Sequence, residues 1–160
     1  MGPKKLSETI GSTTKEAKTI IEKYFESFPT VKQYFASIVE LSKEQGYVET
    51  LLKRRRYFDY ATAVPMVKAA YERESVNTVF QGSAADLIKL SMNKIADVIK
   101  TRNLPVKMML QIHDELIFEV DADKADAMAA EFKEIMETIT TLKVPLKTSL
   151  NIGKHWGELK

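Results

Sequence analysis

Two adjacent carboxylates, Asp114 and Glu115, stand between two apolar runs in the segment VKMMLQIHDELIFEV. After the pair, Leu116, Phe118 and Val120 alternate with other residues, as in a strand with one buried face. Carboxylates held side by side repel one another, and bound Mg²⁺ relieves this repulsion because magnesium prefers hard oxygen ligands. The pair therefore fits either a solvated hairpin turn, because Asp is common in turns, or a magnesium site, and these residues alone do not decide between them.

Histidine and cysteine limit the other kinds of metal chemistry. His113 precedes the carboxylates, His155 lies near the C-terminus, and the sequence has no cysteine. Disulfides and thiolate metal sites are thereby excluded, and two histidines alone make a zinc site unexpected. The lack of cysteine fits a reducing cytoplasm. His113 fits either a hydrogen-bonded structural role or a place in the site.

Two further groups of polar residues could contact nucleic acid. Residues 54–56 are three consecutive arginines, which either protect an exposed strand from mispairing or contact phosphates. Arg73, Asn77 and Gln81 are spaced by four residues and share a face if they lie on one α-helix. Such donors can reach the minor-groove acceptors of a base pair, which are alike for A·T and T·A.

Composition describes an ordinary globular chain of about one domain. It has 160 residues, 44% hydrophobic and 29% charged, with a net charge of +2. This charge argues against a tail that coats nucleic acid indiscriminately and leaves room for a local basic groove. No apolar run approaches the ~18 residues that a membrane helix needs, and the first ten residues lack the apolar stretch of a secretory signal.

Two helices and a small hairpin are predicted in the first part of the chain. Thr13 and Glu16 form a capping-box pattern before the first helix. Pro29 opens a second helix, which Gly46 ends, so that the two form an αα-hairpin. The segment YVETLLKRRRYF that follows is rich in β-branched and aromatic residues, and we expect it to be extended and to turn near Lys53.

The middle of the chain predicts two more helices. The first covers about residues 65–79 and is interrupted at Gly82. Ser83 and Asp86 are then expected to cap a long helix that stops before Pro105.

The remaining residues predict an α+β fold, with helices packed on one face of a small antiparallel sheet. Strands are expected near 106–112, 115–120 and 145–152, with Asp114 at the first turn and a helix near 124–140. The predicted core consists of Leu110, Ile112, Leu116, Phe118, Phe132 and Ile135.

Four segments of the chain, in this order, resemble segments of the family A DNA polymerases: KEAKTIIEKYFESFPTV, GYVETLLKRRRYF, NTVFQGSAADLIKLSM and LQIHDELIFEV. The last resembles the family's motif C, and the terminal G-x-x-W resembles the family's ending. Lys53 stands where a turn glycine is usual, and Phe58-Asp59-Tyr60 replaces the usual Pro-Asp. The first ten residues resemble the sequence after the long fingers helix, so Met1 is expected to be an internal residue.

The resemblance implies roles for residues by position. Asp114 resembles the catalytic, metal-binding aspartate of motif C, and Glu115 resembles its neighbouring carboxylate, with a lesser role. His113 resembles the histidine that contacts the primer terminus.

It also implies contacts with DNA. Arg73, Asn77 and Gln81 resemble the residues that touch the primer–template minor groove near the new base pair. Arg54 and Arg55 resemble the basic pair of the earlier segment.

The organisation and partners implied are those of a DNA-directed DNA polymerase. Residues 1–160 resemble the C-terminal part of the polymerase domain, with the end of the fingers and connecting helices in about 1–80 and the palm with motif C in about 81–160. The implied partners are primer–template DNA, dNTPs and two Mg²⁺ ions in the intact enzyme, in the cytoplasm and without a membrane.

Motif A, with its own metal-binding aspartate, and the fingers helix that holds the nucleotide phosphates have no counterpart in this sequence. We therefore expect the isolated chain to be inactive, to hold no ordered Mg²⁺ and to self-associate through uncovered apolar surface. Two alternatives remain: a non-catalytic nucleic-acid-binding module, and part of a single-subunit RNA polymerase, whose motif C is similar.

Overall fold

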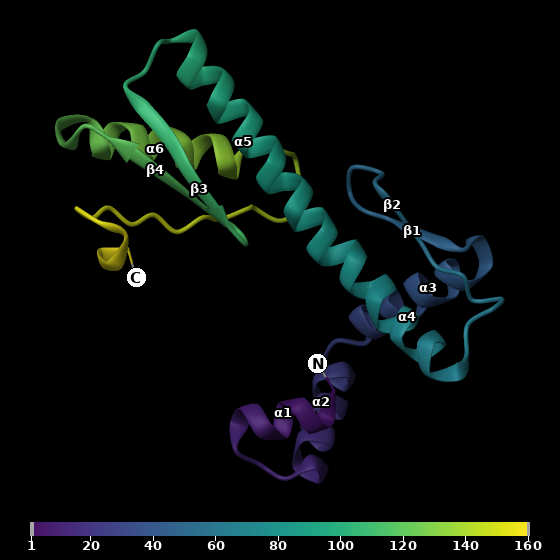
Figure 1. The fold of residues 1–160 in the computed structure, drawn as a ribbon. Coiled ribbons are helices and arrows are strands. Elements are labelled where there is room, and N and C mark those ends of the chain that lie inside the picture. Colours follow the sequence, from purple (N-terminus) through teal and green to yellow (C-terminus); the bar gives the residue numbers. More distant parts are fainter. Residues whose placement is uncertain (1, 160) are drawn as a thin grey trace. The chain divides into compact units, whose positions relative to one another are not determined.

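The computed structural model describes residues 2–159, which form two compact units (Figure 1). The first unit runs to Glu49 and includes Arg55–Thr78. The second consists of Thr50–Arg54 and the chain from Val79 onward. Within the described residues, no helix is both long and apolar enough to cross a membrane.

The first unit is mainly helical, with α1 (Pro3–Ile10), α2 (Thr14–Ser27), α3 (Pro29–Gln45) and α4 (Pro65–Asn77). The capping box before α2 is confirmed, because Glu16 donates its backbone N–H to Thr13 Oγ1 at 3.2 Å and accepts the Thr13 N–H at 2.9 Å. Helix α1 was not predicted. Pro3 opens it and Gly11 ends it in the left-handed conformation, at φ +67°.

The predicted hairpin after α3 is confirmed. Gly46 ends α3 at φ +73°, and β1 (Tyr47–Glu49) then pairs antiparallel with β2 (Arg55–Tyr57). Lys53 takes the left-handed conformation, at φ +65°, that a turn glycine adopts without strain. The chain therefore turns at Lys53, as predicted, without the glycine.

Buried side chains of α2, α3 and the hairpin form the interior of this unit: Ala17, Ile38, Val48 and Phe58. The Phe58 ring lies 5.4 Å from that of Tyr71, which belongs to α4. Lys43 and Glu72 form an ion pair at 2.5 Å that joins α3 to α4.

The interruption predicted at Gly82 is wrong. Gly82 has right-handed helical angles, φ −64° and ψ −41°, and ends a π-helical stretch, η1 (Thr78–Gly82), directly before α5 (Ser83–Thr101). A π-helical turn widens a helix locally and need not end it. The predicted cap is also wrong, because α5 has no side-chain cap and Ser83 and Asp86 bond elsewhere.

The second unit packs two helices on one face of a hairpin, as predicted (Figure 1). Strand β3 (Val106–Ile112) pairs antiparallel with β4 (Glu115–Val120), and η2 (Ala122–Lys124) leads into α6 (Ala125–Glu137). The core is built on Ile95, Val106 and Phe132, around which pack Ile99, Leu104, Met108, Leu116, Phe118, Val120, Met128, Ile135 and Met136.

A bulge in β3 decides which of its side chains face this core. Met108 pairs with Phe118 but Leu110 pairs with Ile117, so Met109 is an extra residue. Beyond an extra residue the alternation of the strand is inverted relative to its partner. The prediction that Leu110 and Ile112 lie in the core is therefore wrong: Leu110 is 46% exposed, and neither residue belongs to the core cluster.

The third strand, predicted near 145–152, is also wrong, because this segment forms no strand and the β3–β4 sheet has two. The Thr148 N–H donates instead to the Glu137 carboxylate at 2.8 Å. The segment leads to a last short helix, η3 (Trp156–Glu158). A side chain of α6 thus takes a bond that a strand ladder would have used.

The core assignment predicts unequal effects of truncation. Phe132→Ala should lower the free energy of unfolding by about 3–5 kcal/mol, because it leaves a cavity among buried side chains. Leu110→Ala should lower it by less than about 1 kcal/mol, because the side chain is already half exposed. Urea unfolding of the two variants measures the difference, and equal losses would contradict the bulged register.

Candidate active site

The carboxylate pair, Asp114 and Glu115, lies at the turn of the β3–β4 hairpin. Ile112 pairs with Glu115, which leaves His113 and Asp114 as a two-residue loop. His113 has φ +52°, the positive value that such tight turns require, and its carbonyl accepts a bond from Gln111 Nε2 at 2.6 Å. The predicted site residues at this turn, His113, Asp114 and Glu115, are all exposed.

The sheet places Glu115 away from the core. Leu116 packs against the core cluster, and successive side chains of a strand point to opposite faces, so Glu115 shares the outer face with its partner Ile112. The pair offers carboxylate oxygens of the kind that Mg²⁺ prefers. Among residues 2–159, no group of three or more acidic or histidine side chains could hold a metal ion.

Each arginine of the run 54–56 is paired with a carboxylate. Arg54 and Arg55 donate through Nε, both at 2.9 Å, whereas Arg56 donates through its terminal nitrogens, to a carboxylate at 2.5 Å and to the Thr78 hydroxyl at 3.3 Å. The carboxylate partners are Asp86 for Arg54, Glu49 for Arg55 and Glu74 for Arg56. Each of the three arginines is therefore held by a different carboxylate.

The buried structural role of Asp86 was not predicted from the sequence. Its side chain is 1% exposed and accepts hydrogen bonds from Thr50 Oγ1 and Arg54 Nε. Burial raises the pKa of this carboxyl, but the bonds from Thr50 and Arg54 outweigh burial and hold the pKa below its ordinary value. Its place three residues after Ser83 suggested a capping box. The useful signal was an aspartate among the apolar residues of a helix, where only a paired charge can be buried.

A second hydrogen bond fixes the same turn. The Leu51 N–H donates to Ser83 Oγ at 2.8 Å, and the Ser83 hydroxyl donates to the Val79 carbonyl. The turn of residues 50–54 is therefore bonded at two points to the first residues of α5.

The three predicted minor-groove residues are exposed, but they do not all lie on α-helix. Arg73 and Asn77 are four residues apart in α4 and share a face. Gln81 lies in the π-helical stretch, where α-helical spacing no longer applies, and it belongs to the other unit. The shared face is thereby supported for Arg73 and Asn77, and the roles of all three residues stay predictions.

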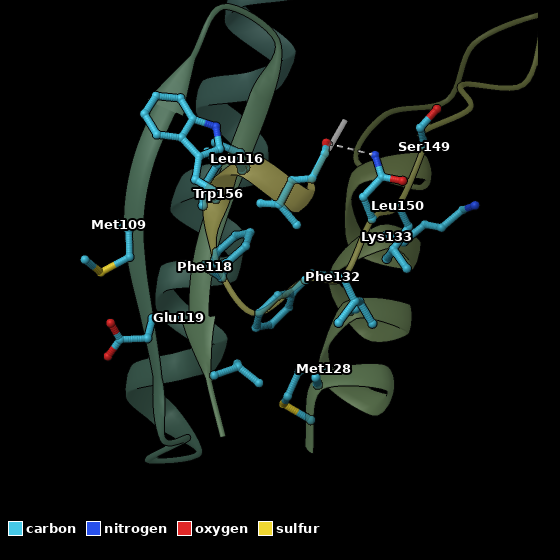
Figure 2. Close-up of a pocket in the computed structure, with 18 of the residues that line it drawn as sticks. Met109, Leu116, Phe118, Glu119, Met128, Phe132, Lys133, Ser149, Leu150 and Trp156 are labelled. Carbon is cyan, nitrogen blue, oxygen red and sulfur yellow. Dashed lines mark hydrogen bonds between the residues drawn. The ribbon is translucent and has the colours of Figure 1, made fainter. Parts of the chain in front are cut away.

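A cleft of about 410 Å³ in the second unit lies between the β3–β4 hairpin, α6 and the C-terminal segment (Figure 2). Phe118 and Phe132, whose ring centroids are 4.8 Å apart, line it together with Leu116 and Trp156. Its lining includes neither carboxylate of the pair. The lining combines apolar side chains next to the core with charged ones, such as Glu119 and Lys133.

The family profile described as DNA polymerase family A matches residues 1–158. The chain belongs to DNA polymerase family A. DNA polymerase I of Helicobacter pylori strain 26695 is 45% identical over the whole chain, the thermostable DNA polymerase I of Thermus filiformis 42% over the whole chain, and DNA polymerase I of Geobacillus stearothermophilus 42% over 97% of it.

A solved structure of this family has the same fold. The POL domain of Pol1 from M. smegmatis, in complex with DNA primer-template and dNTP, superimposes with a TM-score of 0.89 at 34% identity over 99% of the chain. The chain spans 18–19% of the length of the three DNA polymerase I relatives and 28% of the solved one. The resemblance found in the sequence and the α+β class are therefore confirmed.

The Asp86 geometry predicts a pH dependence of stability. A carboxyl whose pKa is lowered on folding contributes stability at pH values above its unfolded pKa, and this contribution is lost as the pH falls through the folded pKa. The difference in unfolding free energy between the wild type and Asp86→Asn should be constant above about pH 5 and should shrink below the ordinary value of 3.8. Urea unfolding from pH 7 to pH 2.5 measures it, and a difference that grows on acidification would contradict the assignment.

Proposed function

We propose that this chain is part of a DNA-directed DNA polymerase, in which the primer 3′-hydroxyl attacks the α-phosphate of a dNTP and pyrophosphate leaves. The observation that carries the proposal is the exposed carboxylate pair at the β3–β4 turn of a family A chain. The fold shared with a polymerase domain solved with primer-template and dNTP supports the same substrates.

Asp114 and Glu115 are the residues that would hold magnesium, Asp114 as the main catalytic carboxylate. Magnesium supplies charge stabilisation at the attacking and leaving oxygens when two ions are bound. The pair offers two acidic side chains at one exposed turn, whereas a two-ion site needs carboxylate ligands on both sides. The remaining carboxylate would come from motif A of the intact polymerase.

The other site residues would position DNA. His113, whose backbone is held by the turn, would contact the primer terminus beside the carboxylates. Arg73 and Asn77 on α4, together with Gln81, would donate to minor-groove acceptors, which test pairing geometry with little sequence preference. In this scheme, about residues 1–80 belong to the fingers and connecting helices and about 81–160 to the palm.

We place the protein in the cytoplasm, because DNA and dNTPs are found there in the bacteria from which the named relatives come. Half-exposed apolar side chains of β3 and the C-terminal segment, Met109, Leu110 and Ile152, support self-association of the isolated chain. The match to a DNA polymerase family favours DNA synthesis over the single-subunit RNA polymerase alternative.

Primer extension tests the catalytic role. In an intact polymerase that contains this chain, Asp114→Ala should lower kcat by at least about 100-fold, because interactions with charge that develops in the transition state are worth several kcal/mol. Asp97→Ala, which removes an exposed carboxylate from α5, is the matched control and should retain full activity. The 160-residue chain alone should extend no primer with Mg²⁺ and all four dNTPs. Extension by that chain, abolished by Asp114→Ala, would mean that it holds a complete site, and DNA binding by the intact protein without extension would favour the non-catalytic module.

Mismatch extension tests the minor-groove role. Asn77→Ala should change the ratio of matched to mismatched primer extension by about 3–10-fold, the worth of one hydrogen bond. Stability should change by less than about 0.5 kcal/mol, because the side chain is exposed. Lys68→Ala on the same helix is the control. An unchanged ratio in Asn77→Ala would remove this residue from the site.

A further inference from the structure

The two ends of the Arg54 side chain lie in different environments. Its Nε donates to Asp86 Oδ1 at 2.9 Å, and Asp86 is 1% exposed, whereas the Arg54 side chain is 63% exposed. Within residues 2–159, the terminal nitrogens of Arg54 donate to no protein acceptor. The guanidinium is thus fixed by its inner edge and presents its outer edge to solvent.

The anchor is itself rigid. The Asp86 carboxylate also accepts a bond from Thr50, whose hydroxyl accepts the Arg54 N–H at 3.2 Å, and the Thr50 N–H donates to the Arg54 carbonyl at 2.9 Å. An ordinary surface ion pair is loose because two long side chains must be ordered together. In this case one partner is buried and short, so most of the ordering is complete before any ligand arrives.

Arg56 provides an internal comparison. Both of its terminal nitrogens are occupied, one by Glu74 and one by Thr78. The planar guanidinium fork recognises phosphate through paired N–H donors, so a fork engaged at its terminal nitrogens offers less to a phosphate than one engaged at Nε. The neighbouring arginines therefore differ in what they can bind.

We propose that Asp86 is a positioning residue that holds the Arg54 guanidinium so that its two terminal nitrogens bind a backbone phosphate of the primer–template. The inference rests on the proposed polymerase function. It adds a named phosphate contact, and it gives the buried carboxylate of α5 a role in binding DNA in addition to its role in folding.

The test is DNA binding by the intact polymerase as a function of salt, with a primer–template duplex as the probe. Arg54→Lys keeps the charge and can still pair with Asp86, but one ammonium cannot also supply the outward fork. It should bind about 3–10-fold more weakly and lower the slope of log K against log salt by about 0.9, the value for one phosphate contact. The matched control, Arg56→Lys, should leave affinity and slope unchanged.

Asp86→Asn tests the positioning step. Its carboxamide keeps the size of the side chain and can still bond Thr50, but it removes the charge that anchors Arg54. It should weaken binding by a similar factor, and adding Arg54→Lys should cause no further loss, because both changes remove one contact. A merely structural role for Asp86 would lower the melting temperature and leave the salt slope unchanged.

The outcomes separate the two proposals. If the wild type binds and extends primers while Arg54→Lys keeps the wild-type affinity and slope, the phosphate contact is refuted and the polymerase function stands. Additive losses in the double variant would refute positioning by Asp86. If the intact wild type does not bind primer–template, the proposed function and this inference both fail.

Discussion

A carboxylate removed from water must be matched by hydrogen bonds and an opposite charge, and in this chain that constraint falls on Asp86. Thr50 and Arg54 meet it, and both belong to a turn more than 30 residues earlier in the sequence. The Leu51–Ser83 bond adds a second connection between the same turn and α5. The conformation of residues 50–54 and the outward direction of Arg54 depend on keeping this one charge paired.

The carboxylate pair differs from the buried Asp86, because Asp114 and Glu115 are exposed. The hairpin that carries them packs on an apolar core. Residues of β3 and β4 pack against Ile95 of α5 and Phe132 of α6, so the hairpin that carries the turn is fixed by a hydrophobic core. Functional groups positioned by a rigid element keep their geometry when a ligand binds. The second unit therefore combines a buried charge that organises structure with exposed charges that are available to a ligand.

Much of the fold could be predicted from the sequence, because its local signals and family-like motifs are strong. The capping box at Thr13, the end of α3 at Gly46 and the turn at Asp114 each follow from local chemistry. The faces of Leu110 and Ile112 could not be predicted, because strict alternation hides an extra residue such as Met109. Nor could the partners of Asp86, since a pattern that fits a helix cap fits a buried ion pair equally well, and only tertiary contacts distinguish them.

Lys53 adds a positive charge at a turn where its backbone conformation is strained. A non-glycine residue in the left-handed region costs about 1 kcal/mol or more, which glycine at this turn would avoid. The lysine also makes residues 53–56 four consecutive cations. The three arginines are each paired with a carboxylate, Arg54 with Asp86, Arg55 with Glu49 and Arg56 with Glu74, so much of this positive charge is balanced within the fold. The strain at Lys53 is therefore a local cost in stability, and the hydrogen bonds that join residues 50–54 to α5 offset it.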